Sequence, residues 1–528
     1  MNRTNRILLC FLYPYAALAL LTSIFWPMGR DQGIFAWVGD VINKGGTPYI
    51  NAWEQKGPGA HYTFAISQYL FGNAQWGIRV LDAALLLIAL AATWSIVRRT
   101  INKTFAHFAT LLLLFQYFGL GFWHTAQPDG WASMLIIIAF AALLYKRNAW
   151  LLISVGLLLG LATSYKFLYA AFILPCAYLI WASDDNASSR EKLFSIFVVL
   201  GGFTVTTAVI LAWLNYHHAL GEYWNIQFGF NRTNHQHANG HSLIERLGPL
   251  ICFILRFGIG VPFLLWGLVS ALLGNPQNKA ASKAFLFSGL VGAGIVLLQN
   301  KYFPYHWMPV FFPLIFFTIL GVHSFSVILS NNFRGDSRMA FIAESWISLA
   351  LLVIMLDKAN LAGHQYIESI PQVFKTLAQR DFSDARFLQT GDYCCGDFSF
   401  QAEYRVSKYI HDKTAPADYV LVWTFDPLIN YLSNRESPSR FALNYPLVAN
   451  TNSETCKSYR REFMDAIMRN PPLYIVTSDA DKNSLMQETS KQYLLHFIEL
   501  NSIFSKQFEL ETVIDKFEIW RRKAASSL

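Results

Sequence analysis

Eleven apolar runs divide the first two thirds of this chain, and short charged segments separate them. The runs lie at about 7–26, 80–97, 105–122, 131–145, 149–163, 167–182, 193–214, 247–273, 284–299, 307–328 and 341–357. A helix needs roughly 17 to 25 apolar residues to cross a bilayer, so several runs are near the lower limit. Only 14% of the residues are charged, against about 25% in soluble proteins. The chain is therefore predicted to be an α-helical polytopic membrane protein with about 11 transmembrane helices.

The basic residues give the predicted topology. Arg3 and Arg6 precede the first run, which we interpret as an uncleaved signal anchor with its N-terminus in the cytoplasm. The predicted inside segments all contain Lys or Arg and are 1–6, 98–104, 146–148, 183–192, 274–283 and 329–340. Lys166 and Lys301 are exceptions, because both fall on the predicted outside. A Lys that breaks the topology rule near a membrane surface is a candidate for function.

The net charge of +8 does not indicate nucleic-acid binding, because many basic residues lie beside apolar runs, where membrane topology accounts for them. After residue 357 the charges become frequent, as in a soluble domain. Short strand-like and helix-like segments alternate there, at Phe400–Asp412, Tyr419–Phe425, Arg461–Met468, Leu473–Thr477 and Phe508–Trp520. We therefore expect a membrane domain at 1–357, with an external loop at 27–79 that carries helices along the membrane, and an external α/β domain at 358–528.

Three of the six cysteines lie in the expected external domain. The positions are Cys394, Cys395 and Cys456, and an oxidising compartment permits disulfides there. The sequence leaves two states open, a bridge from Cys456 to one of the vicinal pair and free thiols.

The polar loop 215–246 is rich in histidine. His235, His237 and His241 have a spacing that suits a metal ion, but no cysteine or carboxylate accompanies them at a useful spacing apart from Glu245. No metal site is therefore predicted, and we expect the loop to order over a substrate.

The segment from Gly29 to Tyr62 concentrates charge in a chain that uses charge sparingly. Asp31 follows the first apolar run almost immediately, at the boundary between water and lipid. Partial desolvation there makes a carboxylate more basic and suits it to accept a proton from a hydroxyl. Glu54 and Lys56 share a turn, and an ammonium group above a membrane suits a lipid phosphate. The alternative is that these are ordinary polar loop residues beside interfacial Trp and Tyr anchors.

This segment resembles the first external loop of the GT-C glycosyltransferases, in the branch of protein O-mannosyltransferases and aminoarabinose lipid A transferases. The residues that carry the resemblance are Asp31-Gln32, Gly45-Gly46-Thr47-Pro48-Tyr49, Glu54-Gln55-Lys56-Gly57-Pro58, Tyr62 and Arg79. Further motifs follow in the family's order, HTAQPD at 124–129, GLATSYK at 160–166 and KYFPYHWMP at 301–309. The segment from Glu403 also resembles the external domain of bacterial members of this family.

The chain departs from the family pattern at Gln32, where Glu is commoner, and at Gly57, where Pro is commoner. The Gln32 difference removes one acidic metal ligand and leaves Asp31 as the main candidate base.

The resemblance implies an inverting membrane glycosyltransferase that moves a sugar from a polyprenyl-phosphate donor to an acceptor hydroxyl. The acceptor would be an envelope lipid, glycan or protein, and the active site and external domain would face the periplasm at the bacterial inner membrane. The resemblance implies catalytic roles for Asp31 and Asp129. The substrate-binding residues that it implies are Glu54, Lys56, Tyr62, Arg79, Lys166, Lys301, Tyr305 and His306. It requires no cofactor and is compatible with a divalent metal.

Alternatives remain open for three of these residues, since Asp129 suits a helix cap, Lys166 a snorkelling lysine and His306 an interfacial position. The alternative function is a transporter or flippase of lipid-linked sugars, which predicts buried charges within the spans and an internal repeat. The sequence has no evident repeat, and its nearest mid-span charges, Asp82 and Arg256, lie close to span ends. A scaffold would leave the ionisable residues of the outside segments without a purpose.

Overall fold

The structure is a computed structural model that describes residues 3–145, 148–183, 187–232, 242–273, 279–332, 337–356, 364–380, 398–483 and 486–524. The chain forms two compact units, each assembled from three stretches of sequence. The first unit comprises Met1–Ile24, Arg79–Leu211 and His241–Ile370. The second comprises Phe25–Ile78, Ala212–Gly240 and Pro371–Leu528.

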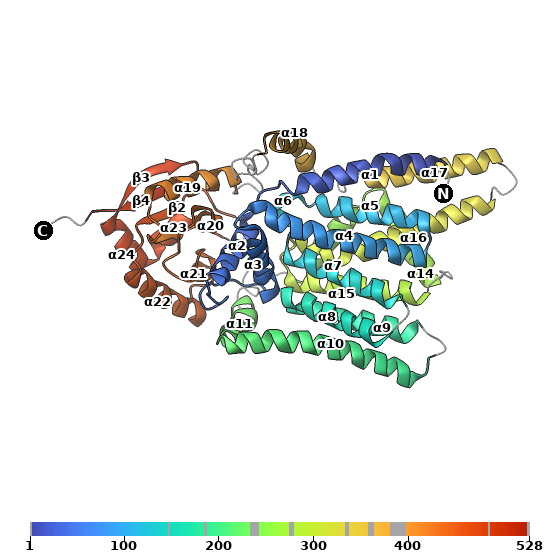
Figure 1. Ribbon diagram of the computed structural model, residues 1–528, viewed down its shortest axis with the longest axis horizontal. Coiled ribbons are helices and arrows are strands. Elements are labelled where there is room, and N and C mark those ends of the chain that lie inside the picture. The colour runs from blue at the N-terminus through green and yellow to red at the C-terminus, as the bar shows by residue number, and fades with distance from the viewer. Residues whose placement is uncertain are drawn as a thin grey trace. The chain divides into compact units, whose positions relative to one another are not determined.

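The first unit is a bundle of apolar helices, most of which run in nearly the same direction (Figure 1). Its elements, some of which extend a few residues beyond it, are α1 (Arg3–Ser23), α4 (Gln75–Thr100), α5 (Lys103–Phe118), α6 (Gly121–His124), α7 (Pro128–Leu143), α8 (Ala149–Tyr165), η1 (Phe167–Phe172), α9 (Ile173–Ala182), α10 (Ser189–Tyr216), α13 (Leu243–Leu255), α14 (Gly260–Leu273), α15 (Lys279–Gln299), η3 (Pro304–Trp307), α16 (Met308–Asn332) and α17 (Ser337–Leu356). Helix α18 (His364–Gln379) is divided between the two units.

Within the described residues, five helices are long and apolar enough to cross a membrane. They are Asn5–Ser23 of α1, α4, α10, α15 and the continuous stretch Pro304–Asn332. Three shorter apolar helices are Pro128–Leu143, Ala149–Tyr165 and Phe167–Ala182. The predicted membrane-embedded helical class is confirmed, and the count of eleven spans stays a prediction.

The predicted span at 247–273 is not a single continuous helix. The chain forms α13 and α14 instead, and the two helices are bent by 105° at a short break. Gly258 lies in this break with a φ of 51°, which favours glycine and ends a right-handed helix. An apolar run continues through the break, so hydropathy alone did not show it.

Helix α10 is the clearest lipid-facing element. Only 11% of its most apolar 18-residue window is buried inside the protein. Large side chains such as Phe194, Phe197, Val205 and Val209 are exposed along it. Contiguous apolar surface of this length is unfavourable in water, so α10 fits a hydrocarbon environment.

Helices α14 and α16 cross at glycines. A Cβ on Gly267 would meet the carbonyl oxygen of Phe317 at 1.9 Å, and one on Gly321 would meet the carbonyl oxygen of Phe263 at 1.8 Å. Small residues let helix backbones approach closely in membranes, where packing replaces the hydrophobic effect as the driving force. This crossing therefore depends on both glycines.

We predict that Gly321→Ala destabilises the first unit by about 1–3 kcal/mol or more, because backbone atoms occupy the space of the new methyl group. The thermal midpoint of the detergent-purified protein will fall. The matched control is Gly294→Ala in α15, where an added Cβ meets nothing within 4 Å. Equal midpoints for the two variants would contradict the close crossing.

The second unit combines helices with a small sheet. Its elements are α2 (Arg30–Asn43), α3 (Pro58–Phe71), α11 (Leu220–Trp224), the π-helix η2 (Asn225–Phe230), α19 (Phe400–Lys413), β1 (Val420–Val422), α20 (Leu428–Ser433), α21 (Tyr445–Val448), α22 (Glu454–Arg469), β2 (Tyr474–Ser478), α23 (Ser490–His496), α24 (Ile498–Gln507), β3 (Phe508–Ile514) and β4 (Phe517–Arg522). The α/β class predicted for the end of the chain is confirmed.

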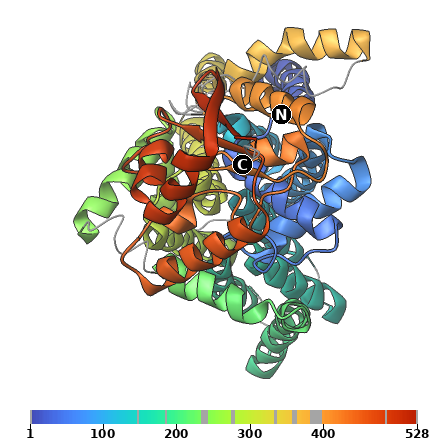
Figure 2. The same cartoon turned by 90° about the vertical axis from the view of Figure 1, so that its left-hand side faces the viewer.

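The sheet has the order β1-β2-β4-β3. Strands β1 and β2 are parallel, with Val420 opposite Tyr474, and the other pairs are antiparallel. Figure 2 shows the β3–β4 hairpin in deep red. Alternate residues of the strands, such as Val422 and Val476, pack against Val406 of α19 in one buried core.

The opposite face of the sheet is covered by aromatic side chains. Trp423, directly after β1, lies 5.5 Å from the ring of Phe463 in α22 and 6.0 Å from Phe497. The sheet is therefore covered on both faces around β1 and β2, which explains the continuous apolar runs at these two strands.

Helix α2 packs tightly within the second unit. A Cβ on Gly33 would meet the Cβ of Leu428 in α20 at 2.8 Å, and one on Gly39 would meet the backbone nitrogen of Ala65 in α3 at 2.9 Å. Helices α3 and α20 therefore hold α2 from two sides.

Cys456 is buried in α22 with a free thiol. The vicinal pair with which a bridge was left open, Cys394 and Cys395, lies outside the described residues.

Candidate active site

In the first unit, Asp129 and Lys166 form a buried ion pair. The Lys166 ammonium lies 2.8 Å from each carboxylate oxygen of Asp129 and donates a third hydrogen bond, also 2.8 Å, to Gln299 Oε1. The Tyr169 hydroxyl donates to Asp129 Oδ1 at 3.1 Å. The side chain of Asp129 is fully buried and that of Lys166 is 13% exposed.

These contacts decide two of the alternatives left by the sequence. The N-cap of α7 is Gln127, so Asp129 lies in the first helical turn and does not cap the helix. Lys166 occupies the extended residue between α8 and η1, and its ammonium turns inward to Asp129 and Gln299. It is therefore a positioned cation, and not a lysine that extends to water.

A second buried network lies beside the first. The guanidinium of Arg79 donates to the Thr125 hydroxyl at 3.0 Å and to the Phe122 carbonyl at 2.8 Å. One helical turn later, Asp82 accepts from the Tyr117 hydroxyl at 2.6 Å. Arg79 is 2% exposed, so its described contacts fix the loop that leads into α7.

Asp82 is a site residue that sequence reasoning set aside. It also accepts from the Trp131 indole at 2.8 Å, and the Tyr117 hydroxyl accepts from the Ala126 amide at 2.9 Å. Asp82 thus ties α5, the loop 119–127 and α7 together. In the sequence, the signal for this role was a carboxylate one helical turn after an arginine at the start of an apolar run.

The segment 299–307 brings further predicted residues to the first unit. Tyr305 and His306 lie in η3 and are 3% and 1% exposed, while Lys301 is partly exposed. The ring centroids of Tyr305 and His306 lie 4.5 Å apart, and the ring centroids of Tyr305 and His124 lie 5.7 Å apart. This segment begins at the ion pair, because Gln299 accepts a hydrogen bond from Lys166. The first unit therefore brings together three predicted outside loops, 123–130, 164–166 and 300–306.

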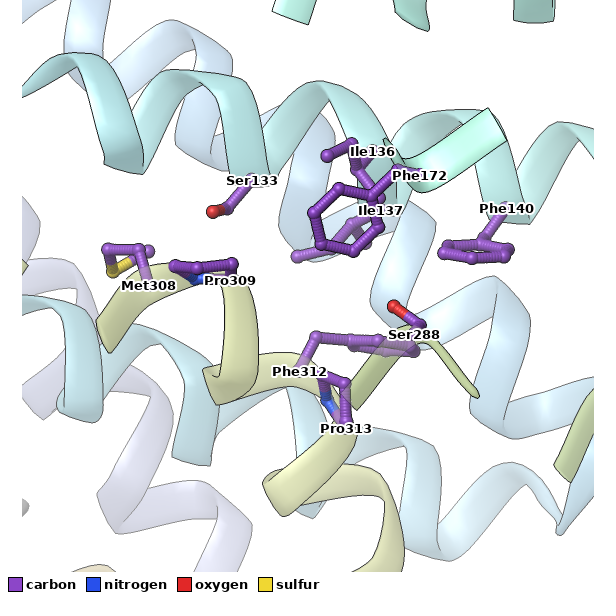
Figure 3. A pocket seen from close by; sticks show the side chains of 10 residues that line it. All are labelled: Ser133, Ile136, Ile137, Phe140, Phe172, Ser288, Met308, Pro309, Phe312 and Pro313. Atoms are coloured by element: carbon purple, nitrogen blue, oxygen red, sulfur yellow. The ribbon is translucent and has the colours of Figure 1, made fainter. Parts of the chain in front are cut away.

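A small cavity lies in the first unit, between α7, η1, α15 and α16 (Figure 3). Its volume is about 10 Å³, and apolar side chains such as Ile136, Phe172 and Phe312 line it. This is space for about one water molecule. The cavity is therefore too small to hold an isoprenoid chain.

In the second unit, Asp31 lies in the first turn of α2. Its side chain is partly exposed and has no hydrogen bond or ion pair within the described part of the chain. The adjacent Gln32 is buried and its Oε1 accepts from the Gly29 amide at 2.5 Å. Gln32 thus closes the start of the helix, and Asp31 lies in its first turn.

Glu54 organises the turn that carries Lys56. Its Oε2 lies 2.9 Å from Nε2 of the buried His61 and accepts from the Lys56 backbone amide at 2.5 Å. The Tyr49 hydroxyl donates to the Lys56 carbonyl at 2.8 Å. Lys56 itself is partly exposed. Within the second unit, the buried carboxylate of Glu54 therefore fixes the backbone conformation of this turn.

Tyr62 lies in α3, with its ring 5.0 Å from that of Trp213. Its hydroxyl is buried without a hydrogen-bond partner among the described residues.

The turn that carries Lys56 is also held by residues more distant in the sequence. Gln227 of η2 donates to the Gln55 carbonyl at 2.8 Å, and Arg440 donates to the Tyr49 carbonyl at 2.5 Å. Arg440 also pairs with Glu222 of α11 at 2.9 Å. The described start of loop 215–246 is therefore helical and holds the Lys56 turn; residues 233–241, with His235, His237 and His241, lie outside the described residues.

An ion cluster fixes the start of α2 beside Asp31. Arg30 Nε lies 2.8 Å from Asp426 Oδ1, and Lys516 Nζ lies 3.0 Å from Oδ2. Burial alone would raise the pKa of Asp426, but the charges of Arg30 and Lys516 outweigh burial and hold the pKa below its ordinary value. Sequence reasoning missed this cluster, whose members are up to 486 positions apart, and the available signal was Asp426 directly after an apolar strand.

We predict that Asp426→Asn costs about 3–5 kcal/mol, because two buried cations lose their partner. The contribution is complete above the unfolded carboxyl pKa of about 3.9 and is lost as the pH falls through the lowered folded pKa. The difference in thermal midpoint between wild type and variant will thus be constant above about pH 5 and shrink in stronger acid. A difference that grows on acidification would contradict the assignment.

Within the described residues, no group of three His, Cys, Asp or Glu is arranged to hold a metal ion.

The comparisons with known proteins support the resemblance to the GT-C membrane glycosyltransferases. Residues 55–213 match the family model described as dolichyl-phosphate-mannose-protein mannosyltransferase. The matched segment contains Lys56, Arg79, Asp129 and Lys166, and Asp31 precedes it.

The fold is similar to two solved enzymes. ArnT from Cupriavidus metallidurans, bound to undecaprenyl phosphate, matches over 99% of both chains with a TM-score of 0.60 and 12% identity. An oligosaccharyltransferase from Archaeoglobus fulgidus in the apo form matches 88% of this chain and 69% of its own, with a TM-score of 0.51 and 12% identity. No curated protein sequence matches the chain significantly. The GT-C resemblance predicted from the sequence is confirmed.

Proposed function

We propose that this protein transfers a sugar from a polyprenyl-phosphate donor to an acceptor hydroxyl at the outer face of the bacterial inner membrane. The observation that carries the proposal is the positioned ammonium of Lys166, held at the end of apolar helices by Asp129 and Gln299. A cation at this level suits the phosphate of a lipid whose chain lies among the helices. The similar ArnT fold was solved with undecaprenyl phosphate, which supports this donor class.

The proposed reaction is a single displacement with inversion. The acceptor oxygen attacks the anomeric carbon on the face opposite the phosphate, the bond from that carbon to the phosphate oxygen breaks, and the polyprenyl phosphate leaves with the electron pair. Asp31 accepts the proton of the attacking hydroxyl. Lys56, Lys166 and Lys301 offset the charge that develops on the leaving phosphate.

The other predicted residues have supporting roles in this scheme. Glu54 positions the Lys56 turn, and Asp129 positions Lys166. Arg79 holds the loop before α7, so we assign it positioning and not direct phosphate contact. Tyr62, Tyr305 and His306 remain proposed substrate contacts.

The finer assignments are part of the same proposal. They are a membrane domain at 1–357, a periplasmic domain at 358–528, an envelope lipid, glycan or protein as acceptor, and chemistry that requires no cofactor and is compatible with a divalent metal.

The deciding experiment compares the envelope glycans of cells with and without the protein by mass spectrometry. We expect one glycan or glycolipid to lose the mass of one sugar when the protein is absent, and the purified protein in liposomes to restore it with a polyprenyl-phosphate sugar. Movement of that lipid across the bilayer without transfer would overturn the proposal in favour of a flippase.

A further inference from the structure

A pocket of about 400 Å³ opens in the second unit, away from the residues assigned above. It lies between the second half of α2, the loop after that helix, the segment 435–440 and the end of α22. Its volume is within the range of small-molecule sites, roughly 300–1,000 Å³. Most such sites are lined by apolar groups, whereas this one is lined mainly by polar side chains.

Several charges of the wall are paired with one another. Arg440 donates to both carboxylate oxygens of Glu462, at 2.7 and 2.8 Å, and Lys44 lies 2.8 Å from Asp40. Arg435 donates to backbone carbonyls of its own surroundings, including Thr414. The wall holds four basic side chains, Lys44, Arg435, Arg440 and Arg469, and three acidic ones, Asp40, Glu436 and Glu462. These charges nearly cancel, so the wall favours a neutral ligand over a phosphate or a metal ion.

Other groups of the wall keep hydrogen-bonding capacity. Asn51 Oδ1 accepts from the Thr47 amide, and its Nδ2 has no acceptor within the described residues. Asn470 Nδ2 donates to the Pro438 carbonyl, which leaves Asn470 Oδ1 as an acceptor. The exposed Arg469 and Glu436 add unpaired guanidinium nitrogens and a carboxylate in the same described region.

Donors and acceptors therefore both line the pocket, and the indole of Trp37 adds a flat apolar wall. Each sugar hydroxyl is both a donor and an acceptor. This lining fits a polyhydroxylated, uncharged ligand better than a lipid chain or an anion.

The position of the pocket on α2 excludes the reacting sugar. Asp40 follows Asp31 by nine residues, which places it about 14 Å further along the helix and about half a turn around it. Arg440 nevertheless links the wall to the Lys56 turn, because it donates to the Tyr49 carbonyl and accepts from the Trp53 amide at 2.8 Å. A ligand here would be a remote part of a longer substrate.

We propose that this pocket binds a neutral glycan portion of the acceptor, away from the hydroxyl that reacts. The proposal rests on the proposed function, since only a transferase has an acceptor. Binding energy from remote, non-reacting groups positions a substrate for the chemical step.

The first test measures binding without turnover. The probe is the neutral oligosaccharide fraction released from the host envelope, freed of phosphate, and titrated by calorimetry onto the full-length protein in nanodiscs. We expect Asn51→Ala combined with Arg469→Ala to weaken binding by roughly tenfold or more, through the loss of two hydrogen bonds. The matched control is Arg461→Ala, an exposed arginine of the same helix α22 outside the pocket, which will bind like wild type.

Inorganic phosphate serves as the competing probe. Saturable phosphate binding that the double variant abolishes, together with no oligosaccharide binding, would overturn the glycan assignment in favour of an anion site. Oligosaccharide binding by the double variant at the wild-type affinity would overturn it as well.

The second test separates this proposal from the proposed function. In the transfer assay the double variant will raise the KM for the acceptor and leave kcat and the KM for the donor unchanged. If the wild type transfers sugar and the double variant keeps the wild-type KM for the acceptor, the pocket does not bind the acceptor. The proposed function would then stand. Specific oligosaccharide binding by a protein that transfers no sugar would overturn the proposed function, and with it the acceptor assignment.

Discussion

Replacing Asp31 by Asn will lower kcat by about 10²- to 10⁴-fold and leave the fold intact. The side chain is partly exposed and makes no described ion pair, so its charge contributes little to folding. Asn is nearly isosteric and suits the start of a helix, but it does not accept a proton at neutral pH. The measurement is single-turnover transfer from a polyprenyl-phosphate sugar in liposomes, with the thermal midpoint recorded in parallel.

The control is Asp412→Asn, which removes an exposed carboxylate of the second unit that pairs with Lys408 in its own helix. We expect wild-type turnover from this variant, because an exposed pair of this kind contributes little. Asp31→Asn should also bind the donor normally, since the charges proposed for the phosphate lie elsewhere. Wild-type turnover in Asp31→Asn would remove Asp31 from the mechanism.

Apolar periodicity predicted the helices of the first unit closely. The run 149–163 became Ala149–Tyr165, and the run 80–97 became Gln75–Thr100. Hydropathy has no information on backbone direction, so it missed the bend between α13 and α14. The backbone of Gly258 makes that bend, while the composition around it stays apolar.

The candidate site was predictable where a charge stood out against its surroundings. Lys166 and Lys301 stood out because they are basic residues at the ends of apolar runs on the predicted outside, and Asp129 was named by the family resemblance. Their partners were not found, because a hydrogen bond such as Lys166 to Gln299 joins residues 133 positions apart. An uncharged amide at the end of an apolar helix gives no sequence signal of that contact.

The role of Glu54 was also not predictable from the sequence. The motif predicted that Glu54 and Lys56 act on a substrate, since both are charged and share a turn. In the second unit, Glu54 is buried and bonds the Lys56 backbone amide and His61. Burial turns a carboxylate toward the donors inside the protein, and the sequence does not report which face of a turn is covered.

The Asp129–Lys166 pair allows a test in which stability and function separate. Lys166→Met leaves the buried carboxylate of Asp129 without its cation, and Asp129→Asn leaves the Lys166 ammonium without its anion. Breaking a buried pair from one side costs about 3–5 kcal/mol, whereas replacing both members by neutral groups is often close to neutral. We therefore expect both single variants to be clearly less stable than the double variant Asp129→Asn/Lys166→Met.

Transfer activity will not follow this recovery. If Lys166 binds the leaving phosphate, the double variant lacks that cation and stays at least about 10²-fold slower than wild type, although it is folded. A purely structural pair predicts instead that activity returns together with stability. The experiment measures thermal midpoints and single-turnover rates for wild type, the two single variants and the double variant, and a stable double variant with wild-type rates would exclude Lys166 from phosphate binding.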